Sequence, residues 1–111
     1  MKALTKMEVG AGHWEVIDKP VPKVSAGQIL IKVDYIGICG SDLHTFEGHY
    51  NANAKGVTIG HEFAGTVAEI GDGVEGFKVG DPVTSETTFE ICGTCRYCKD
   101  GEYNLCSSRK G

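Results

Sequence analysis

Three short β-prone stretches occur in the first half of the chain, residues 2–8, 13–20 and 29–36, and apolar and polar residues alternate in part along the first two. The second and third stretches are rich in β-branched and aromatic residues, as is typical of strands. Two prolines and a glycine interrupt the chain over residues 20–27, before the third stretch begins. The pattern therefore predicts three strands, with a break between the second and the third.

The second half adds two predicted strands, residues 63–70 and 81–89, which a glycine-rich segment separates. One short helical turn is predicted between residues 41 and 46, because Ser41 can act as its N-cap. Several short strands with glycine-rich turns and few helices favour a mainly β fold, either a small barrel or a sandwich.

The glycine-rich segment between these two strands, residues 71–76, reads GDGVEG. It matches the G-x-G-x-x-G pattern of dinucleotide-binding loops, but that pattern has its meaning only where a strand leads into a helix. The residues that follow, FKVGDPV, contain a proline and show no helical period. We therefore interpret the segment as a hairpin connection and assign no cofactor-binding residue to it.

The composition is that of one soluble globular domain, with 111 residues, 41% of them apolar, and a net charge of −4. The negative charge argues against a nucleic-acid partner, since phosphate-backbone binders usually present a basic face. The N-terminus lacks the apolar segment of a secretion signal, and no apolar run approaches the roughly 20 residues of a membrane span. A cytoplasmic location without a membrane partner is the expectation, and thiols stay reduced there.

Four of the five cysteines lie close together with the spacing C-x2-C-x2-C-x7-C, at Cys92, Cys95, Cys98 and Cys106. A reducing compartment and an odd cysteine count disfavour disulfides. Bacterial iron–sulfur clusters use a similar run, but their fourth cysteine follows after three residues and precedes a proline. A closed set of four thiolates is typical of structural zinc. The spacing therefore predicts a structural zinc site.

A second possible metal site combines the fifth cysteine, Cys39, with His61 and Glu62. Catalytic zinc sites use such mixed ligands and keep one position open, although an isolated cysteine or histidine is more often structural. Asp42 could accept the second ring N–H of His61 and fix its tautomer. Spacing alone leaves both readings open.

Two polar neighbours of Cys39 could move protons at such a site. The hydroxyl of Ser41 could pass a proton between substrate and solvent, with His44 further along the relay. These are the two residues for which we expect a catalytic role.

Four motifs occur here in a characteristic order, ICGSDLH, GHEFAG, VGDPV and the cysteine run. In this order they resemble the zinc-dependent medium-chain alcohol and polyol dehydrogenases, over nearly the whole chain. The resemblance implies a GroES-like, partly open β-barrel with two zinc sites. Gly40, where liver-type enzymes have arginine, resembles the sorbitol or iditol, threonine and butanediol dehydrogenase branches; Pro82, where arginine is common, is interpreted as a loop variation.

The resemblance also implies a role for each candidate residue. Cys39 and His61 would bind the catalytic zinc, with Glu62 as a direct or exchangeable ligand. Ser41 and His44 would form the proton relay. The structural zinc would lie in a lobe of about residues 90–108, held by Cys92, Cys95, Cys98 and Cys106.

Members of this family also have a Rossmann domain that binds NAD or NADP, and the segment that matches the letters of its fingerprint here, residues 71–76, is interpreted as a hairpin connection. We therefore expect residues 1–111 to be the N-terminal part of the GroES-like catalytic domain, inactive alone. The remaining catalytic zinc ligand would lie beyond residue 111. The full-length protein is expected to be a homodimer or homotetramer.

The predicted function is the oxidation of a secondary alcohol or polyol with NAD or NADP. An alternative is a zinc-ribbon-type structural or interaction module without catalysis, in which only the cysteine lobe matters. That alternative leaves the CGSDLH and GHE motifs without a role. An iron–sulfur electron carrier is the third possibility.

Overall fold

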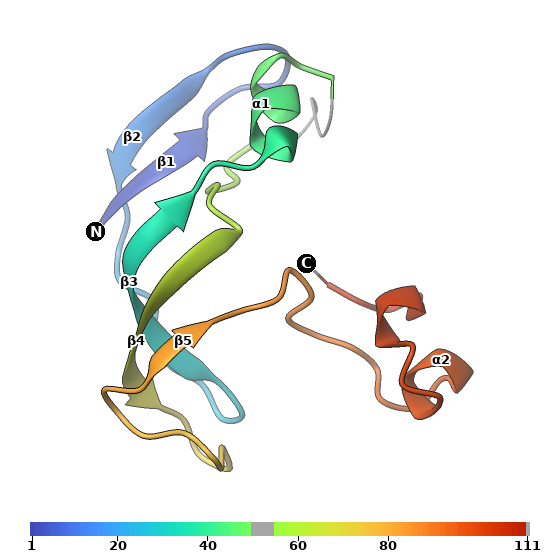
Figure 1. The fold of residues 1–111 in the computed structure, drawn as a ribbon. Coiled ribbons are helices and arrows are strands. Elements are labelled where there is room, and N and C mark those ends of the chain that lie inside the picture. Colours follow the sequence, from blue (N-terminus) through green and yellow to red (C-terminus); the bar gives the residue numbers. More distant parts are fainter. Residues whose placement is uncertain (50–54, 111) are drawn as a thin grey trace.

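A computed structural model describes residues 1–49 and 55–110 of the chain (Figure 1). Its strands are β1 (Lys2–Lys6), β2 (Trp14–Asp18), β3 (Ile29–Gly37), β4 (Glu62–Ile70) and β5 (Pro82–Thr84). Its helices are α1 (Gly40–Phe46) and α2 (Arg96–Lys99), with a 3₁₀ turn, η1, at Tyr103–Leu105. The prediction of a mainly β fold with few helices is confirmed. Among the described residues no helix is long and apolar enough to cross a membrane.

Within the described residues the strands form two antiparallel sheets. Strands β1 and β2 pair along their full length, from Lys2 opposite Asp18 to Lys6 opposite Trp14. In the other sheet β4 lies between β3 and β5, and two register shifts interrupt its pairing with β3. Such irregularities bend a strand and increase its twist. The long β3 and β4 accordingly curve past the shorter pair (Figure 1).

Helix α1 begins one residue before the predicted cap. Its N-cap is Cys39, in an extended conformation, and the predicted cap Ser41 lies inside the first turn. The reason is Asp42, whose Oδ2 accepts the backbone N–H of Cys39 at 2.9 Å. A carboxylate at the third helical position thus satisfies the N–H of the cap residue, and the N-cap assignment of Ser41 was wrong.

Strand β5 is much shorter than the predicted segment 81–89. Pairing with β4 ends at Thr84, which lies opposite Ala64. The chain then leaves the sheet, and Glu90 forms an isolated antiparallel bridge with Lys110. The residues after Thr84 therefore connect the sheet to the separate cysteine lobe (Figure 1).

The GDGVEG segment between β4 and β5 runs through turns and irregular backbone and opens no helix. Its first glycine has a packing role, because a Cβ on Gly71 would lie 2.0 Å from the backbone oxygen of Ser25. The glycines here serve a close backbone approach and tight turns, as the hairpin interpretation predicted.

Candidate metal centres

The first candidate centre lies where β3 ends and β4 begins. Cys39 follows β3, while His61 and Glu62 stand at the start of β4. Gly37 pairs with Glu62 in the sheet, so strand pairing brings the two segments together. The donor atoms of Cys39, His61 and Glu62 all lie within 4.8 Å of one another. The structure thus gathers three residues that the sequence analysis grouped from motifs alone.

Asp42 supports this group from helix α1. The carboxylate is buried, and its Oδ1 lies 3.4 Å from Nδ1 of His61. The other oxygen of Asp42 accepts a hydrogen bond from the Cys39 N–H. The Asp42 side chain thus contacts two of the three candidate ligand residues, the backbone of Cys39 and the ring of His61. A carboxylate placed on one imidazole nitrogen leaves the other available to a metal, which is the usual arrangement around zinc-binding histidines.

A sulfur, an imidazole nitrogen and a carboxylate oxygen are all zinc ligands. His61 is half-buried and Glu62 is exposed, so the group faces solvent on one side. Mixed ligands with an accessible side match a catalytic zinc site better than a closed structural one. The donor set therefore fits the metal that the resemblance implies.

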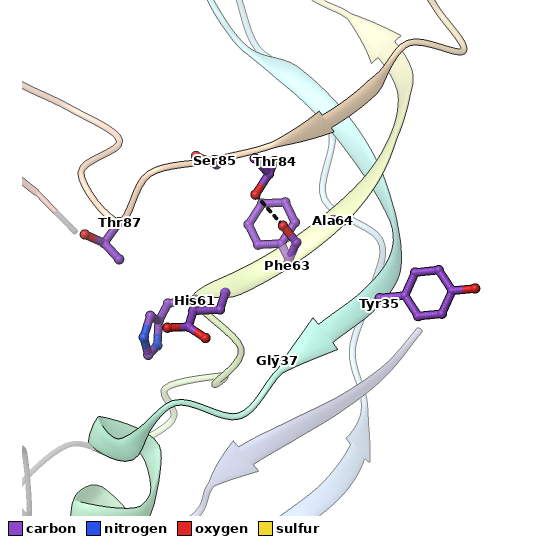
Figure 2. A pocket seen from close by; sticks show the side chains of 9 residues that line it. Tyr35, Gly37, His61, Phe63, Ala64, Thr84, Ser85 and Thr87 are labelled. Atoms are coloured by element: carbon purple, nitrogen blue, oxygen red, sulfur yellow. Dashed lines mark hydrogen bonds between the residues drawn. The ribbon is translucent and has the colours of Figure 1, made fainter.

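Two open hollows lie beside this group. One is lined by Phe63, Thr84 and Ser85 together with His61, and Thr84 donates to the Phe63 carbonyl at 2.6 Å (Figure 2). Thr84 and Ser85 were not predicted from the sequence. Pairing of the two predicted strands would have indicated them, since it places Thr84 opposite Ala64.

The second hollow is lined by Ser41, His44 and His61, with Arg109 from the far end of the described chain. Ser41 and His44 thus share a hollow with the metal-ligand candidate His61. Within residues 1–49 and 55–110 no hydrogen bond joins Ser41 to His44. The structure brings the two relay candidates to one place without linking them directly.

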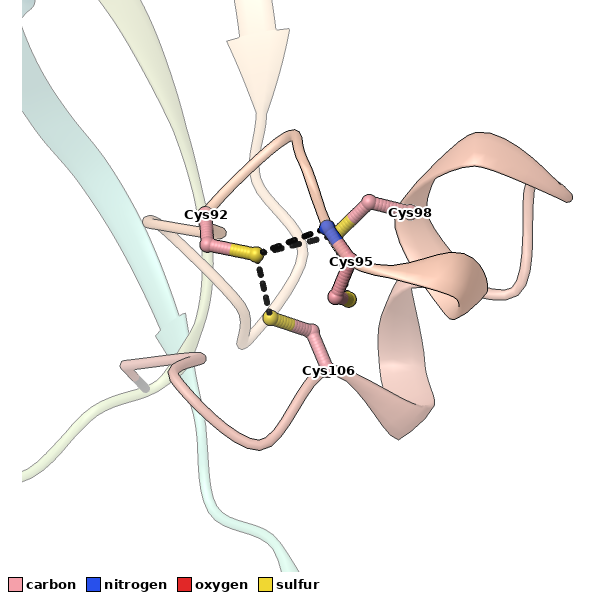
Figure 3. Close-up of side chains that lie close together, drawn as sticks. All are labelled: Cys92, Cys95, Cys98 and Cys106. Atoms are coloured by element: carbon pink, nitrogen blue, oxygen red, sulfur yellow. Dashed lines mark hydrogen bonds between the residues drawn. The ribbon is translucent and has the colours of Figure 1, made fainter.

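The second candidate centre is the cysteine lobe, where four sulfurs converge (Figure 3). The sulfur of Cys92 lies 3.6 Å from that of Cys106 and 3.9 Å from that of Cys98, and Cys95 and Cys98 are 3.5 Å apart. A tetrahedral zinc with bonds of about 2.3 Å separates its sulfurs by about 3.8 Å, whereas a disulfide bond measures about 2.05 Å. All five cysteines carry free thiols. The spacing fits four zinc thiolates.

Local turns build this arrangement. Cys95 is the N-cap of α2 and Cys98 lies within that helix. Gly93 and Gly101 adopt φ values of +68° and +81°, which suit glycine far better than other residues. The chain then passes through η1 to the buried Cys106. These two glycine turns therefore fold the segment so that its four cysteines meet (Figure 3).

The thiols of the lobe differ in acidity. Backbone N–H groups, first that of Thr94 and then that of Cys95, lower the pKa of Cys92 to about 6. Burial, together with the neighbouring thiol of Cys95, raises the pKa of Cys98 to about 12. Four sulfurs this close cannot all ionise without a compensating charge, and a bound cation supplies it. The electrostatics of the lobe thus also fit a metal.

A third group of donors was not predicted. His44, Glu47 and His49, at the C-terminal end of α1, also hold donor atoms within 4.8 Å of one another. From the sequence, His44 was expected in the proton relay, and neither Glu47 nor His49 was given a role. Their close spacing around the end of a helix was the feature that could have indicated this group.

The family model of the alcohol dehydrogenase GroES-like domain matches residues 25–111. Sorbitol dehydrogenase from Halalkalibacterium halodurans is 60% identical over 111 residues, which are all of this chain and 32% of that protein. D-Arabitol-phosphate dehydrogenase from Enterococcus avium is 52% identical over the same shares. The chain therefore spans about a third of the length of the curated relatives it matches.

A solved structure gives the same picture. A zinc-binding dehydrogenase from Sinorhizobium meliloti, bound to NADP, superposes with a TM-score of 0.83 at 34% identity. The match covers 99% of this chain and 31% of that protein. The similarity thus extends over the sheets, α1 and the cysteine lobe together.

Proposed function

Because the chain belongs to the family of alcohol dehydrogenase GroES-like domains, we propose that it forms the zinc-binding part of a dehydrogenase that oxidises a secondary alcohol or polyol. The GroES-like fold implied by the motifs is confirmed by this membership and by the solved relatives. The observation that carries the activity is the convergence of Cys39, His61 and Glu62 beside an open hollow.

In this proposal residues 1–111 are the N-terminal part of the catalytic domain, and residues 90–108 are its structural zinc lobe. Cys92, Cys95, Cys98 and Cys106 hold one zinc ion, and their sulfur spacing supports this. The relatives are about three times as long as the matched part, since the chain covers 32% of them. The nicotinamide cofactor, NAD or NADP, would be bound by a separate Rossmann domain.

Cys39, His61 and Glu62 would hold a second, catalytic zinc ion. When bound there, zinc would supply Lewis-acid polarisation of the substrate hydroxyl, while the oxidised nicotinamide would accept the hydride from the carbinol carbon. Asp42 holds the His61 ring in place through the contact to Nδ1. Its burial keeps that contact away from competing water.

Proton removal falls to the residues of helix α1. The Ser41 hydroxyl accepts the proton of the substrate hydroxyl and releases its own toward the imidazole of His44, which is exposed and returns it to solvent. Both side chains line the hollow that contains His61, which supports this order. An adjustment on substrate binding would close the relay, as catalytic hydrogen bonds often tighten only in the complex.

The substrate class is a secondary alcohol or a polyol. Thr84, Ser85 and Thr87 line the hollow beside His61, and their hydroxyl groups would bind neighbouring hydroxyls of a polyol. The named activities of the sorbitol and arabitol-phosphate relatives support this class. Free thiols throughout fit a cytoplasmic enzyme, and exposed apolar residues on β3 fit a homodimer or homotetramer.

The test is a steady-state assay of the full-length, zinc-loaded protein with sugar alcohols, a sugar alcohol phosphate and simple secondary alcohols, using NAD⁺ and NADP⁺ in turn. We expect reduced nicotinamide to form with at least one polyol. Cys39→Ser and Glu62→Gln should lower turnover, while Glu69→Gln, a matched change of an exposed glutamate on β4, should not. Full turnover in Cys39→Ser would contradict the catalytic assignment.

A non-catalytic zinc module would show no turnover with any alcohol and would need only the lobe. The convergence of Cys39, His61 and Glu62 has no role in such a module. The same assay therefore separates the two functions.

A further inference from the structure

The third donor group lies at the exposed C-terminal end of α1, and neither zinc centre uses it as a set. One carboxylate oxygen, Oε2 of Glu47, lies 3.6 Å from Nδ1 of His44 and 3.6 Å from Nδ1 of His49. The two imidazole rings face the carboxylate with their centroids 6.3 Å apart. Two imidazoles thus converge on a single carboxylate oxygen.

The backbone fixes this convergence. The N–H of Gly48 donates to the Thr45 carbonyl at 3.2 Å, and the N–H of His49 donates to the His44 carbonyl at 2.9 Å. This is the pair of bonds that ends a helix in the Schellman motif, with Gly48 at φ +83° as the left-handed residue. The motif turns the chain back, so His49 stands beside His44 although five positions separate them.

The two carboxylate–imidazole separations of 3.6 Å are close to those found around a bound transition metal. With zinc bonds of about 2.1 Å to nitrogen and oxygen, neighbouring ligand atoms in a tetrahedral site lie about 3.4 Å apart. Two imidazoles and one carboxylate form a donor set that suits zinc, nickel and copper and is too nitrogen-rich for magnesium or calcium. The three side chains are 57–72% exposed, so an ion can reach them from solvent.

We propose that His44, Glu47 and His49 bind one divalent transition-metal ion of the zinc, nickel or copper class, at a surface site distinct from the two zinc centres. The ion takes one nitrogen of each imidazole and one oxygen of the carboxylate and leaves its other positions to water. An ion bound this way occupies the imidazole of His44. It therefore lowers turnover, a consequence that rests on the proposed role of His44 in the relay.

The binding test uses the full-length protein, loaded with zinc and free of any histidine tag, dialysed against a series of nickel chloride concentrations. Nickel and zinc per chain are then measured by elemental analysis. We expect one added nickel per chain with the zinc content unchanged. Loss of even an outer partner weakens metal binding by roughly 10- to 100-fold, and we expect at least that loss in His49→Gln and in Glu47→Gln.

The control is His13→Asn, which removes another exposed histidine and keeps a residue that tolerates its φ of +60°. Nickel binding should be unchanged in this variant. Equal nickel binding by the wild type, His49→Gln and Glu47→Gln would overturn the site. So would a loss of zinc in step with nickel uptake, because nickel would then occupy the zinc centres.

Turnover measured along the same nickel series separates this site from the proposed function. We expect nickel to inhibit the wild type and His13→Asn but not His49→Gln, whose basal turnover should be normal. Stoichiometric nickel binding that depends on Glu47 and His49 but leaves turnover intact would uphold the site. It would contradict the relay role of His44 instead.

Discussion

At the scale of single residues, Asp42 connects the start of α1 with the candidate catalytic zinc site. It is 6% exposed, and its two oxygens contact the Cys39 N–H and the His61 ring. A buried carboxylate is tolerated only where donors satisfy it. The motif C-G-S-D therefore places two residues on one helix turn. These are the ligand candidate Cys39 and Asp42, which orients the ring of a second ligand candidate, His61.

Replacing Asp42 with asparagine should destabilise the fold and weaken the metal site. The amide preserves the shape but can present an NH₂ group where an oxygen accepted a hydrogen bond. Leaving a buried group unsatisfied costs about 1 to 3 kcal/mol, which urea unfolding would measure, and zinc content should fall. Asp34→Asn is the control, since Asp34 is exposed and accepts only from Thr66 among the described residues. Equal stability of the two variants would contradict this role.

Position 48 requires glycine for two reasons: its φ is positive, and no space is left there for a Cβ. At φ +83° a Cβ would lie 3.0 Å from the backbone nitrogen of Ala11, whereas Gly76 has the same φ and open space around it. Gly76→Ala should lose about 1 to 2 kcal/mol from backbone strain. Gly48→Ala should lose about 1 to 3 kcal/mol more from crowding, measured by thermal or urea unfolding. Equal losses of stability in the two variants would contradict this expectation, since they would show that the backbone near Ala11 moves away without an energetic cost.

At the scale of elements, the strands were largely predictable from the sequence. Stretches of β-branched and aromatic residues locate β2, β3 and β4, because a half-buried pleated surface selects those side chains. The length of β5 was not predictable, because its pairing with β4 ends where Thr84 lies opposite Ala64, and that contact is absent from the local pattern. The start of α1 was mispredicted because cysteine is not among the usual N-cap residues. The Asp42 carboxylate, only three residues after Cys39, satisfies the N–H of that cap.

The same distinction holds for the candidate sites. The cysteine lobe could be predicted because all its ligands lie in one short segment. The group around Cys39 needed motifs, since strand pairing brings its members together. The group at His44 and His49 was missed because a helix-terminating turn creates it.

Tyr103, in η1 of the lobe, forms a hydrogen bond with Glu86 in the segment after β5, and this hydrogen bond should be lost at alkaline pH. Its hydroxyl donates to Glu86 at 2.9 Å, and this bond, with the carboxylate charge, raises the pKa of Tyr103 above its ordinary value of 10.0. Stabilisation from a raised pKa is complete below the ordinary value and is lost as pH rises through the raised one. Ultraviolet titration should show a phenol that ionises late, and this phenol should disappear in Tyr103→Phe but remain in Tyr97→Phe. A persistent late phenol in Tyr103→Phe would contradict the assignment.

At the scale of the whole molecule, the described residues form a small core beside a large apolar exposure. Val67 and Ala3 are buried, while Tyr35 and Ile38 are each 79% exposed. Exposed apolar residues in such number mark surfaces that another part of a protein or another subunit covers. The relatives, of which this chain spans about a third, have the length to provide such cover.

The two proposed zinc centres should respond differently to mutation in the full-length protein. We expect two zinc ions per chain by elemental analysis. Cys106→Ser should lose one zinc and unfold at a much lower temperature, since structural zinc contributes on the order of 10 kcal/mol to folding. Cys39→Ser should also lose one zinc, yet with a small change in melting temperature and loss of turnover. If Cys39→Ser lowered the melting temperature strongly and Cys106→Ser abolished turnover without doing so, the two assignments would be the wrong way round.

The compact spacing of the lobe has a consequence for the order in which the protein is assembled. Cys92 and Cys106 are 14 positions apart, and turns bring all four sulfurs together. Contacts between near neighbours form before distant ones, because shorter loops close at a smaller entropic cost. The set around Cys39 must wait for β3 to pair with β4. In a full-length chain refolding with scarce zinc, the proposed lobe site should therefore bind zinc first, and the proposed catalytic site would be left empty.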